Sequence, residues 1–210
     1  AVMHGRTNEN RMVLLYNKLD LWLVRSADRV VAVSAAMGLA LEHGGVDKSK
    51  IRVIENAIDP EAYQTGKDGG SFRRRCGARP NDFLVGVIGR LSPEKGVAVF
   101  LEAMRTVIKA LPATKAVIVG DGQEAQRLQT SAQAAGLQDH VHFSGYESDI
   151  SSVFSALDLL VIPSLSEGLP NVLLEAFLHQ RPVVGTAVGG LPEVMQGIFS
   201  TWLVPPGDAE

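Results

Sequence analysis

Two glutamates placed eight residues apart are the clearest candidates for ligand contacts in this sequence. Glu167 precedes an expected helix that begins at Asn171, and Glu175 lies within that helix. Because positions four apart share one helix face, Glu175 would face back toward the helix start, from which Glu167 approaches. Carboxylates accept hydrogen bonds from hydroxyl groups, so the pair suits the hydroxyls of two sugars. The alternative is that Glu175 pairs with a buried partner while Glu167 is solvated.

Two cations and one helix start suit the binding of a diphosphate. Arg90 and Lys95 follow the apolar run FLVGVI. An arginine can hold two phosphate oxygens at once, and a lysine adds a point charge. The segment 168–171 leads directly into the helix at Asn171, whose free backbone N–H groups would point at a phosphate. We therefore expect an anion site here.

Glycines follow several other apolar runs. They are Gly89, Gly120, Gly122 and Gly145. Such glycines would let a ligand approach the backbone closely, although each could equally serve only a tight turn between a strand and a helix. The stretch GVIGRLSPEKG lacks the G-x-G-x-x-G spacing of a dinucleotide fingerprint, and no G-x-x-x-x-G-K-[ST] loop is present. The sequence therefore favours neither a dinucleotide cofactor nor a P-loop hydrolase.

The elements that must position these residues alternate in type along the second part of the chain. Apolar runs at 83–88, 115–119, 141–143, 157–162 and 182–184 are expected strands, and 94–111, 124–135, 150–156 and 171–179 are expected helices. Continuous apolar runs are typical of strands covered on both faces, and their alternation with helices predicts an α/β fold with a doubly wound parallel sheet. In such sheets ligands bind beyond the carboxyl ends of the strands. All the glycines and cations above, and Glu167, follow expected strands.

Residues 57–70 contain glycines and a proline with little periodic apolar content, and we interpret them as an interdomain linker. Residues 1–56 would then be the last portion of a preceding domain, with expected strands at 29–33 and 51–54, and 71–210 the ligand-binding domain. Neither end of the sequence reads as a natural domain boundary, so we expect a fragment of a longer protein.

Charge and composition narrow the function classes. The formal net charge is -3 at pH 7, which gives no field for gathering nucleic acid. The basic run Arg73–Arg75 is interpreted as a solvated patch. The single cysteine, Cys76, permits no internal disulfide and weakly favours a reducing compartment. No apolar run reaches the length of a membrane span, and the N-terminal residues do not resemble a signal peptide.

Several motifs together resemble a known enzyme family. PSLSEGLPNVLLEAFLHQRPVVGTAVGGLPEVM resembles the E-x7-E region of the retaining glycosyltransferases of family 4, also called group 1. GVIGRLSPEKGV resembles the phosphate-binding strand and loop of that family, VGDG its next loop, and VHFSGY the loop that holds the nucleobase. DRVVAVS, IRVIENAIDPEAY and LVPPGD also fit, so the resemblance covers nearly the whole chain.

The resemblance implies a Rossmann-like enzyme of GT-B type, in which two domains face each other across a cleft and the C-terminal one binds a nucleotide-diphosphate sugar, a UDP- or GDP-sugar. It implies that Arg90 and Lys95 neutralise the diphosphate, that Glu167 binds donor-sugar hydroxyls, and that Glu175 binds the ribose. The backbone of the remaining donor-site residues would border the donor: Gly89, Gly120, Gly122, Gly145, Tyr146, Gly168, Leu169, Pro170 and Asn171. Pro170 has no N–H to contribute.

One further candidate site residue lies near the start of the sequence, and the chain departs from the family pattern at several points. The resemblance implies that His4, in an HG-like segment, lies near the reacting sugar, although a surface histidine is equally plausible. Relatives often carry E-G-F-G where this chain has Glu167 followed by GLP, and N-G-I-D where it has NAID. The resemblance implies that most of the acceptor domain is missing, so we expect this chain to bind nucleotide but to turn over poorly or not at all.

The resulting hypothesis is a hexosyl transfer to a glycan or lipid-linked acceptor, in the cytoplasm or at the inner face of the cytoplasmic membrane, with no cofactor. No Asp-x-Asp motif suggests a metal site. Two alternatives stay open. One keeps the fold but changes the reaction to that of a nucleotide-sugar epimerase or a phosphorylase. The other is a non-catalytic domain that only binds nucleotide sugars or serves as a scaffold.

Overall fold

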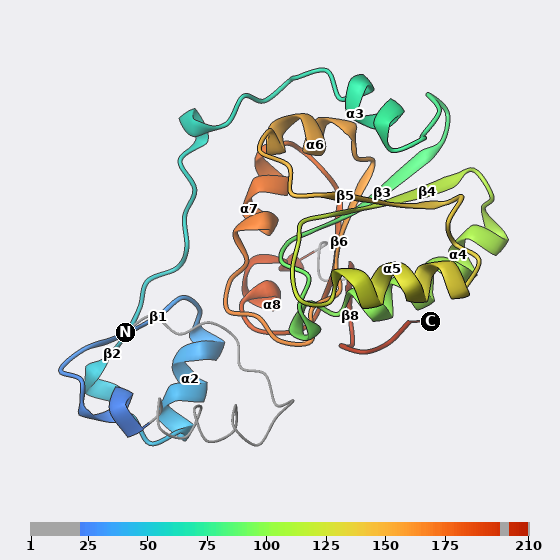
Figure 1. Cartoon of the computed structure of the whole chain (residues 1–210). Helices are drawn as coiled ribbons and strands as arrows, with labels where there is room; N and C mark the ends of the chain where they lie inside the picture. Colours follow the sequence, from blue (N-terminus) through green and yellow to red (C-terminus); the bar gives the residue numbers. More distant parts are fainter. Residues whose placement is uncertain (1–21, 198–201, 210) are drawn as a thin grey trace.

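The computed structural model describes residues 22–197 and 202–209, and it contains two parallel β-sheets of unequal size (Figure 1). A two-stranded sheet belongs to the N-terminal segment, and a six-stranded sheet forms the centre of the remainder. A long connection joins the two parts and runs along one side of the larger one (Figure 1). The predicted α/β class, with a parallel sheet and alternating helices, is the architecture observed.

The smaller sheet pairs β1 (Val30–Ala32) with β2 (Ile51–Val53) in parallel, and α2 (Ala35–His43) connects them. The Ser34 hydroxyl accepts a hydrogen bond from the Met37 N–H and so caps the start of α2, as its position in the sequence suggests. A small core of Val24, Val30, Ala32, Leu41 and Val46 holds this unit together.

The larger sheet has the order β5-β4-β3-β6-β7-β8, with every pair of neighbours parallel. Its strands are β3 (Phe83–Ile88), β4 (Thr114–Val119), β5 (Val141–Gly145), β6 (Leu159–Ile162), β7 (Val183–Thr186) and β8 (Leu203–Val204). The helices are α3 (Gly70–Arg75), α4 (Val97–Ala110), α5 (Ala125–Ala134), α6 (Ile150–Ala156), α7 (Asn171–Leu178) and α8 (Leu191–Val194). The strand order reverses direction between β3 and β6, which is the switch point at which such sheets bind ligands.

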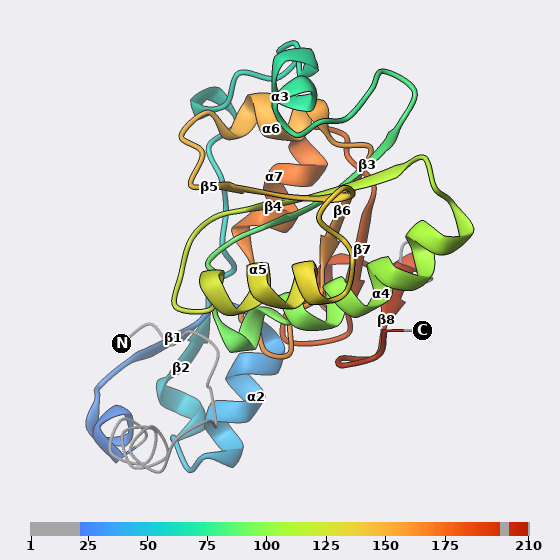
Figure 2. The ribbon, with the colours of Figure 1, turned by 45° about the vertical axis from the view of Figure 1, so that its right-hand side comes forward.

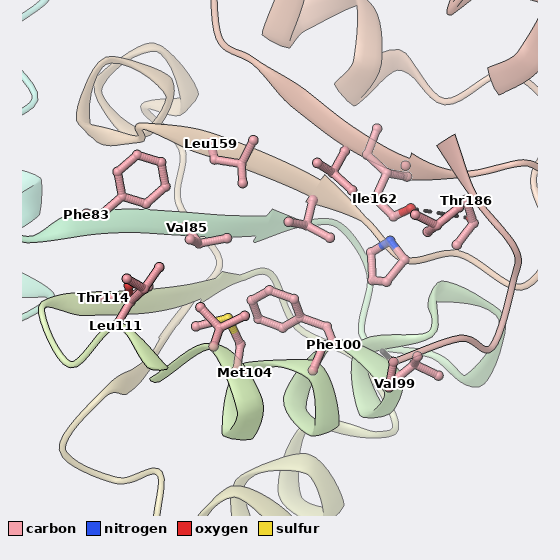
Figure 3. Close-up of a pocket in the computed structure, with 18 of the residues that line it drawn as sticks. Phe83, Val85, Val99, Phe100, Met104, Leu111, Thr114, Leu159, Ile162 and Thr186 are labelled. Atoms are coloured by element: carbon pink, nitrogen blue, oxygen red, sulfur yellow. Dashed lines mark hydrogen bonds between the residues drawn. The ribbon is translucent and has the colours of Figure 1, made fainter. Parts of the chain in front are cut away.

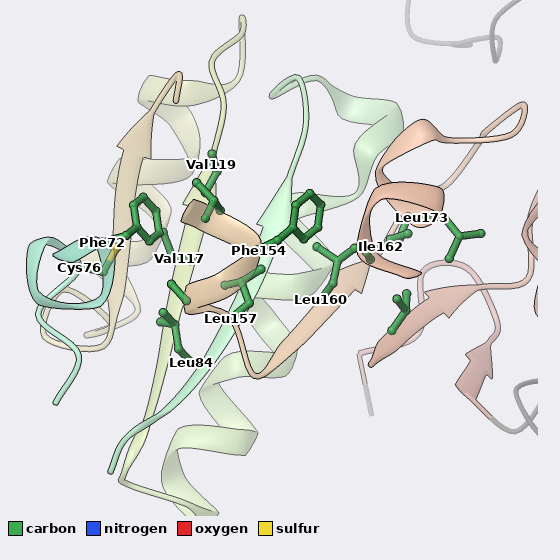
Figure 4. Packing of buried hydrophobic residues seen from close by; sticks show 14 of the residues in the cluster. Phe72, Cys76, Leu84, Val117, Val119, Phe154, Leu157, Leu160, Ile162 and Leu173 are labelled. Carbon is green, nitrogen blue, oxygen red and sulfur yellow. The ribbon is translucent and has the colours of Figure 1, made fainter. Parts of the chain in front are cut away.

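Alternating side chains of the central strands supply two separate cores. Val85 and Val87 of β3 pack with residues of α4 and α5, whereas Leu84 packs with residues of α3, α6 and α7. Figure 2 shows α4 and α5 on one side of the sheet and α3, α6 and α7 on the other. The second core includes Phe72, Phe154 and Leu160, and its packing is seen in Figure 4. Both faces of the central strands are therefore covered by helices, as the apolar runs of the sequence predict.

The observed elements differ from the predicted ones mainly at their starts. The helix expected over 94–111 is divided, because Gly96 adopts a left-handed conformation (φ 64°) between a 3₁₀ turn at Pro93–Lys95 and α4. The strand expected over 157–162 begins only at Leu159, since Leu157 ends α6. The short β8 was not predicted. Among the described residues, no helix is both apolar and long enough to cross a bilayer.

Arg73, in the last turn of α3, departs from the sequence-based interpretation of the basic run as a solvated patch, whereas Arg74 and Arg75 are exposed as that interpretation predicts. Arg73 donates from Nη1 to the carbonyl oxygen of Ala156 (2.6 Å) and to Asp158 Oδ2 (3.0 Å), and from Nη2 to the carbonyl oxygen of Asp82 (2.5 Å). Asp158 Oδ2 also accepts from the backbone N–H of Leu84. Arg73 thus ties α3 to the ends of α6 and β3, while Arg74 is exposed.

The N-terminal segment is joined to the larger unit by a charged cap. Glu193, on α8, accepts hydrogen bonds from the backbone N–H groups of Ala35 (Oε2, 2.8 Å) and Ala36 (Oε1, 2.7 Å). A carboxylate at a helix N-terminus satisfies donors that have no partner within the helix and faces the positive end of its dipole. The two parts of the chain therefore share one hydrogen-bonded contact at the start of α2.

We expect Arg73→Ala to destabilise the protein by about 2 kcal/mol, because it leaves two backbone carbonyls and Asp158 without their partner. Urea denaturation of the 210-residue chain measures the effect. Arg74→Ala is the matched control, and it should change stability by less than about 0.5 kcal/mol. Equal effects of the two substitutions would show that Arg73 is not a structural contact.

Burial raises the pKa of the Cys76 thiol to about 11. Since the thiolate is the reactive form, we expect the native chain at pH 8 to react with a thiol-specific reagent far more slowly than the urea-unfolded chain. The comparison of the two labelling rates checks this. Rapid labelling of the folded protein would contradict the burial of Cys76 beneath α3.

Candidate functional site

The loops that follow β3 and β4 are locked together by glycines. A Cβ on Gly120 would lie 2.0 Å from the carbonyl oxygen of Gly89, and one on Gly122 would lie 2.3 Å from that of Leu91. The Leu91 N–H donates to the carbonyl oxygen of Asp121 at 2.9 Å. Only glycine permits these approaches, so both glycines are required to hold the β3 loop in place. Arg90 lies at the tip of this loop and is exposed.

A second close approach brings Lys95 against the end of β6. Gly96 has a φ of 64°, and a Cβ there would lie 1.9 Å from the carbonyl oxygen of Pro163. In addition, the Leu165 N–H donates to the carbonyl oxygen of Glu94 at 2.8 Å. The Lys-Gly pair of the sequence thus has a physical reason: the glycine lets the turn that carries the lysine rest on the neighbouring strand end.

Lys95, Ser164 and Glu167 form the centre of the site. Glu167 Oε1 accepts from Lys95 Nζ (2.5 Å) and from the Ser164 hydroxyl (2.7 Å). The side chains of Glu167 and Lys95 are 9% and 25% exposed. The Thr186 hydroxyl in turn donates to the Ser164 carbonyl oxygen at 2.5 Å. A buried carboxylate needs such partners to offset its desolvation, so the alternative of a solvated Glu167 is wrong.

A small cleft of about 20 Å³ lies between the ends of β3 and β6. Its lining includes Gly89, Arg90, Lys95, Ser164, Glu167 and Val172. Val172 belongs to the first turn of α7, where no side chain caps the helix start at Pro170. The backbone N–H groups of that turn point out of the N-terminus of the helix, which is the positive end of its dipole. Two cations, one carboxylate and one helix start therefore converge at the carboxyl edge of the sheet.

Glu175 is held at a different point of α7 and does not line this cleft. Its Oε1 accepts a hydrogen bond from the phenol of Tyr63 at 2.8 Å. Burial, together with the bond to Glu175 and its charge, raises the pKa of Tyr63 to about 12. The partner that sequence analysis left open for Glu175 is thus a tyrosine from the linker.

The loop 168–171 packs between the two parts of the chain. A Cβ on Gly168 would lie 2.7 Å from Val33 Cγ2, and one on Gly189 would lie 2.2 Å from the Glu167 carbonyl oxygen. The Asn56 side-chain amide donates to the Leu169 carbonyl oxygen at 2.7 Å. Leu169 and Pro170 are buried, and Asn171 begins α7 with its side chain exposed. The backbone around Glu167 is therefore fixed from both sides.

The remaining sequence-based candidates lie further from the centre. Gly145 ends β5, and its carbonyl oxygen accepts from the Gly120 N–H at 2.8 Å. Tyr146 follows with 82% of its surface exposed. His4 lies outside the described residues. Among the residues that the structure describes, no group of three His, Cys, Asp or Glu side chains is placed to hold a metal ion.

A larger, apolar cavity lies elsewhere among the described residues. It has a volume of about 570 Å³ and lies between α4 and the strands β3, β6 and β7 (Figure 3). Its described lining includes Val85, Phe100, Met104 and Leu159, and it contains no lysine or arginine. Because a diphosphate needs cationic partners, this cavity is a poor site for a charged nucleotide.

Sequence reasoning missed three residues that hold the site. Ser164 and Tyr63 gave no signal, because a serine after a strand and a tyrosine in a linker are common and their partners are far along the chain. Glu193 gave a weak signal. The pattern LPEV places an acidic residue in the first turn of a helix, which predicts a contact with the start of that same helix and not with the start of a second one.

Comparison with known proteins follows the two parts of the structure. The model of the glycosyl transferases group 1 family matches residues 71–210, and that of glycosyltransferase family 4 matches residues 1–62. The chain is 27% identical over 209 residues to UDP-Gal:alpha-D-GlcNAc-diphosphoundecaprenol alpha-1,3-galactosyltransferase of Escherichia coli, which covers 97% of this chain and 54% of that protein. It is 32% identical over 167 residues to 2-deoxystreptamine N-acetyl-D-glucosaminyltransferase of Streptomyces fradiae, with 78% and 40% covered. The chain thus spans about half the length of these relatives.

Solved structures agree with the sequence relatives. HepE from Anabaena, crystallised with UDP-glucose, superimposes with a TM-score of 0.83 at 29% identity, over 93% of this chain and 56% of HepE. A second HepE crystal, with UDP and glucose, gives a TM-score of 0.82 over 93% of this chain and 55% of HepE. The fold of GT-B type expected from the resemblance is confirmed. With a family model matching well over half of its length, this chain belongs to the glycosyl transferases group 1 family.

Proposed function

We propose that this chain is the donor-binding part of a larger glycosyltransferase. The enzyme would move a sugar from a nucleotide-diphosphate sugar to a glycan or lipid-linked glycan, with retention of the anomeric configuration. The observation that carries the proposal is the convergence of Arg90, Lys95, Glu167 and the start of α7 at one cleft. The UDP-glucose in the HepE crystal supports a UDP-sugar as donor.

The diphosphate would lie at the mouth of the cleft. The enclosed space of about 20 Å³ is too small for a phosphate group, so the anion would rest against Arg90, Lys95 and the N–H groups of α7. Arg90 is exposed at the loop tip and can reach two phosphate oxygens without breaking a described contact. Lys95 can turn toward the phosphate while Ser164 still holds Glu167.

The two glutamates would bind the sugars on either side of the diphosphate. Both described bonds to the Glu167 carboxylate are made to Oε1, which leaves Oε2 for a hydroxyl of the transferred sugar. Glu175, one helical turn beyond Asn171, would take the ribose. The backbone of Gly145 and Tyr146, beside the Gly120 turn, would border the base.

The chemistry assigned to this half of the enzyme is stabilisation of the leaving group. As the bond between the anomeric carbon and the diphosphate oxygen breaks, negative charge accumulates on the diphosphate. Pre-aimed cations and backbone N–H groups stabilise that charge without reorganising at the moment of reaction. Glu167 would orient the sugar by its hydroxyls during this step.

The names of the relatives support a proposal for the acceptor and the site of action. The E. coli relative is named for an acceptor that is a diphosphoundecaprenol-linked sugar. A lipid-linked acceptor would bring the enzyme to the cytoplasmic face of the membrane as a peripheral protein. The acceptor would be bound by the part of the larger protein that faces this cleft.

Arg90→Ala should weaken UDP-glucose binding to the 210-residue chain by about 10- to 100-fold, because charged hydrogen bonds to phosphate contribute about 1.5–3 kcal/mol. The additional change Lys95→Ala should abolish detectable binding. Isothermal titration calorimetry measures both. The binding of uridine, which has no phosphate, should be unaffected by Arg90→Ala.

Lys109→Ala, which removes an exposed cation at the end of α4, is the control for net charge. Circular dichroism should first establish that each variant is folded, because removal of Lys95 leaves Glu167 without its ionic partner. Unchanged affinity of a folded Arg90→Ala variant for UDP-glucose would refute the diphosphate assignment.

Retention can be tested on a full-length form of the enzyme. With an α-linked UDP-sugar as donor, we expect an α-linked product, identified from the coupling constant of its anomeric proton in the NMR spectrum. A β-linked product would exclude the retaining mechanism and would leave the donor-site assignments to be judged by the binding data alone.

A further inference from the structure

The contact between Tyr63 and Glu175 joins two segments that are 112 residues apart in the sequence. Tyr63 follows a 3₁₀ turn at Pro60–Ala62, in which the Asp59 side chain accepts from the Glu61 N–H at 3.0 Å. The Tyr63 N–H donates to the Pro60 carbonyl oxygen at 3.3 Å. Proline at the first position and a capping aspartate both favour this turn, so the linker presents the tyrosine in a defined direction.

The ring of Tyr63 is also placed by His179, the residue that ends α7. It meets the ring of His179 edge-on, with centroids 6.0 Å apart and an angle of 82°. His179 is buried, stacks on Phe154 with centroids 4.9 Å apart, and places Nδ1 2.8 Å from the Glu175 carbonyl oxygen. Glu175 and His179 lie one turn apart on the same helix face, so Tyr63 contacts both.

The bond is suited to orienting a carboxylate. A tyrosine phenol is already protonated in the physiological pH range, and burial with the bond to Glu175 raises the pKa of Tyr63 further, to about 12, so it remains a donor. It holds Oε1 of Glu175, so the carboxylate loses rotational freedom before any ligand arrives. The described residues make no other hydrogen bond to that carboxylate, which leaves Oε2 for a ligand hydroxyl. Such pre-organisation raises affinity by reducing the entropy lost on binding.

We propose that Tyr63 is a positioning residue for the donor: its hydroxyl fixes the Glu175 carboxylate for the vicinal hydroxyls of the donor's ribose. The inference rests on the proposed function, because it assigns a ligand to Glu175. It goes further in making the linker part of the donor site. A movement of the linker that withdraws Tyr63 would then weaken the grip on the ribose.

The test compares UDP with 2′,3′-dideoxy-UDP, which lacks the two ribose hydroxyls. The ligands are titrated by calorimetry into the 210-residue chain and into its Tyr63→Phe variant. Phenylalanine keeps the ring against His179 and removes only the hydroxyl. We expect UDP to bind the variant about 5- to 10-fold more weakly, and 2′,3′-dideoxy-UDP to bind both proteins equally. In a Glu175→Ala background, Tyr63→Phe should have no further effect on UDP.

Glu61→Gln, in the same 3₁₀ turn but without a described side-chain contact, is the matched control and should bind both nucleotides as the unmodified chain does. Equal weakening of the two nucleotides by Tyr63→Phe would mean that the tyrosine acts only on the fold, and this would overturn the inference. Tighter UDP binding would overturn it too, since the tyrosine would then mask Glu175. If the unmodified chain bound neither nucleotide, the proposed function would fail together with the inference. This result is distinct from the two above, in which the unmodified chain binds UDP and only the effect of Tyr63→Phe differs from the expected one.

Discussion

The charges of the site depend on a glycine that leaves no room for a side chain. Gly96 rests against the carbonyl oxygen of Pro163, where a side chain would leave only 1.9 Å. This contact brings the turn carrying Lys95 beside the loop carrying Glu167, and the two side chains form an ion pair that is largely shielded from water. A bulkier residue at position 96 would separate β3 from β6 at their carboxyl ends, and the cation would lose its partner.

The ion pair offsets the cost of burying Glu167. A buried glutamate is costly unless it is paired and hydrogen-bonded, and Lys95 and Ser164 meet that requirement. In the proposed function, an anion would compete with Glu167 for the same ammonium group. The distance between these two neighbouring loops therefore sets how strongly Glu167 holds Lys95.

The N-terminal segment and linker contribute more to the donor side than a simple connection would. Asn56 binds the backbone at Leu169, Tyr63 binds Glu175, and Glu193 binds the start of α2. All three contacts involve α7, α8 or the loops that precede them, and the α7 loop carries Glu167. The elements that carry the proposed donor site are thus braced by the N-terminal segment and the linker.

The sequence by itself determined the alternation of strands and helices, the parallel sheet, and the edge at which the candidate site residues gather, because apolar runs and glycines act locally. It also indicated Arg90, Lys95 and Glu167 as candidates. Only the tertiary structure decided which residues meet. Gly96 splits the expected helix because of a neighbour 67 residues away, Arg73 is a structural contact rather than a solvated charge, and Glu175 bonds to Tyr63 across the linker. Such pairings depend on side chains that are distant in sequence, and no local pattern encodes them.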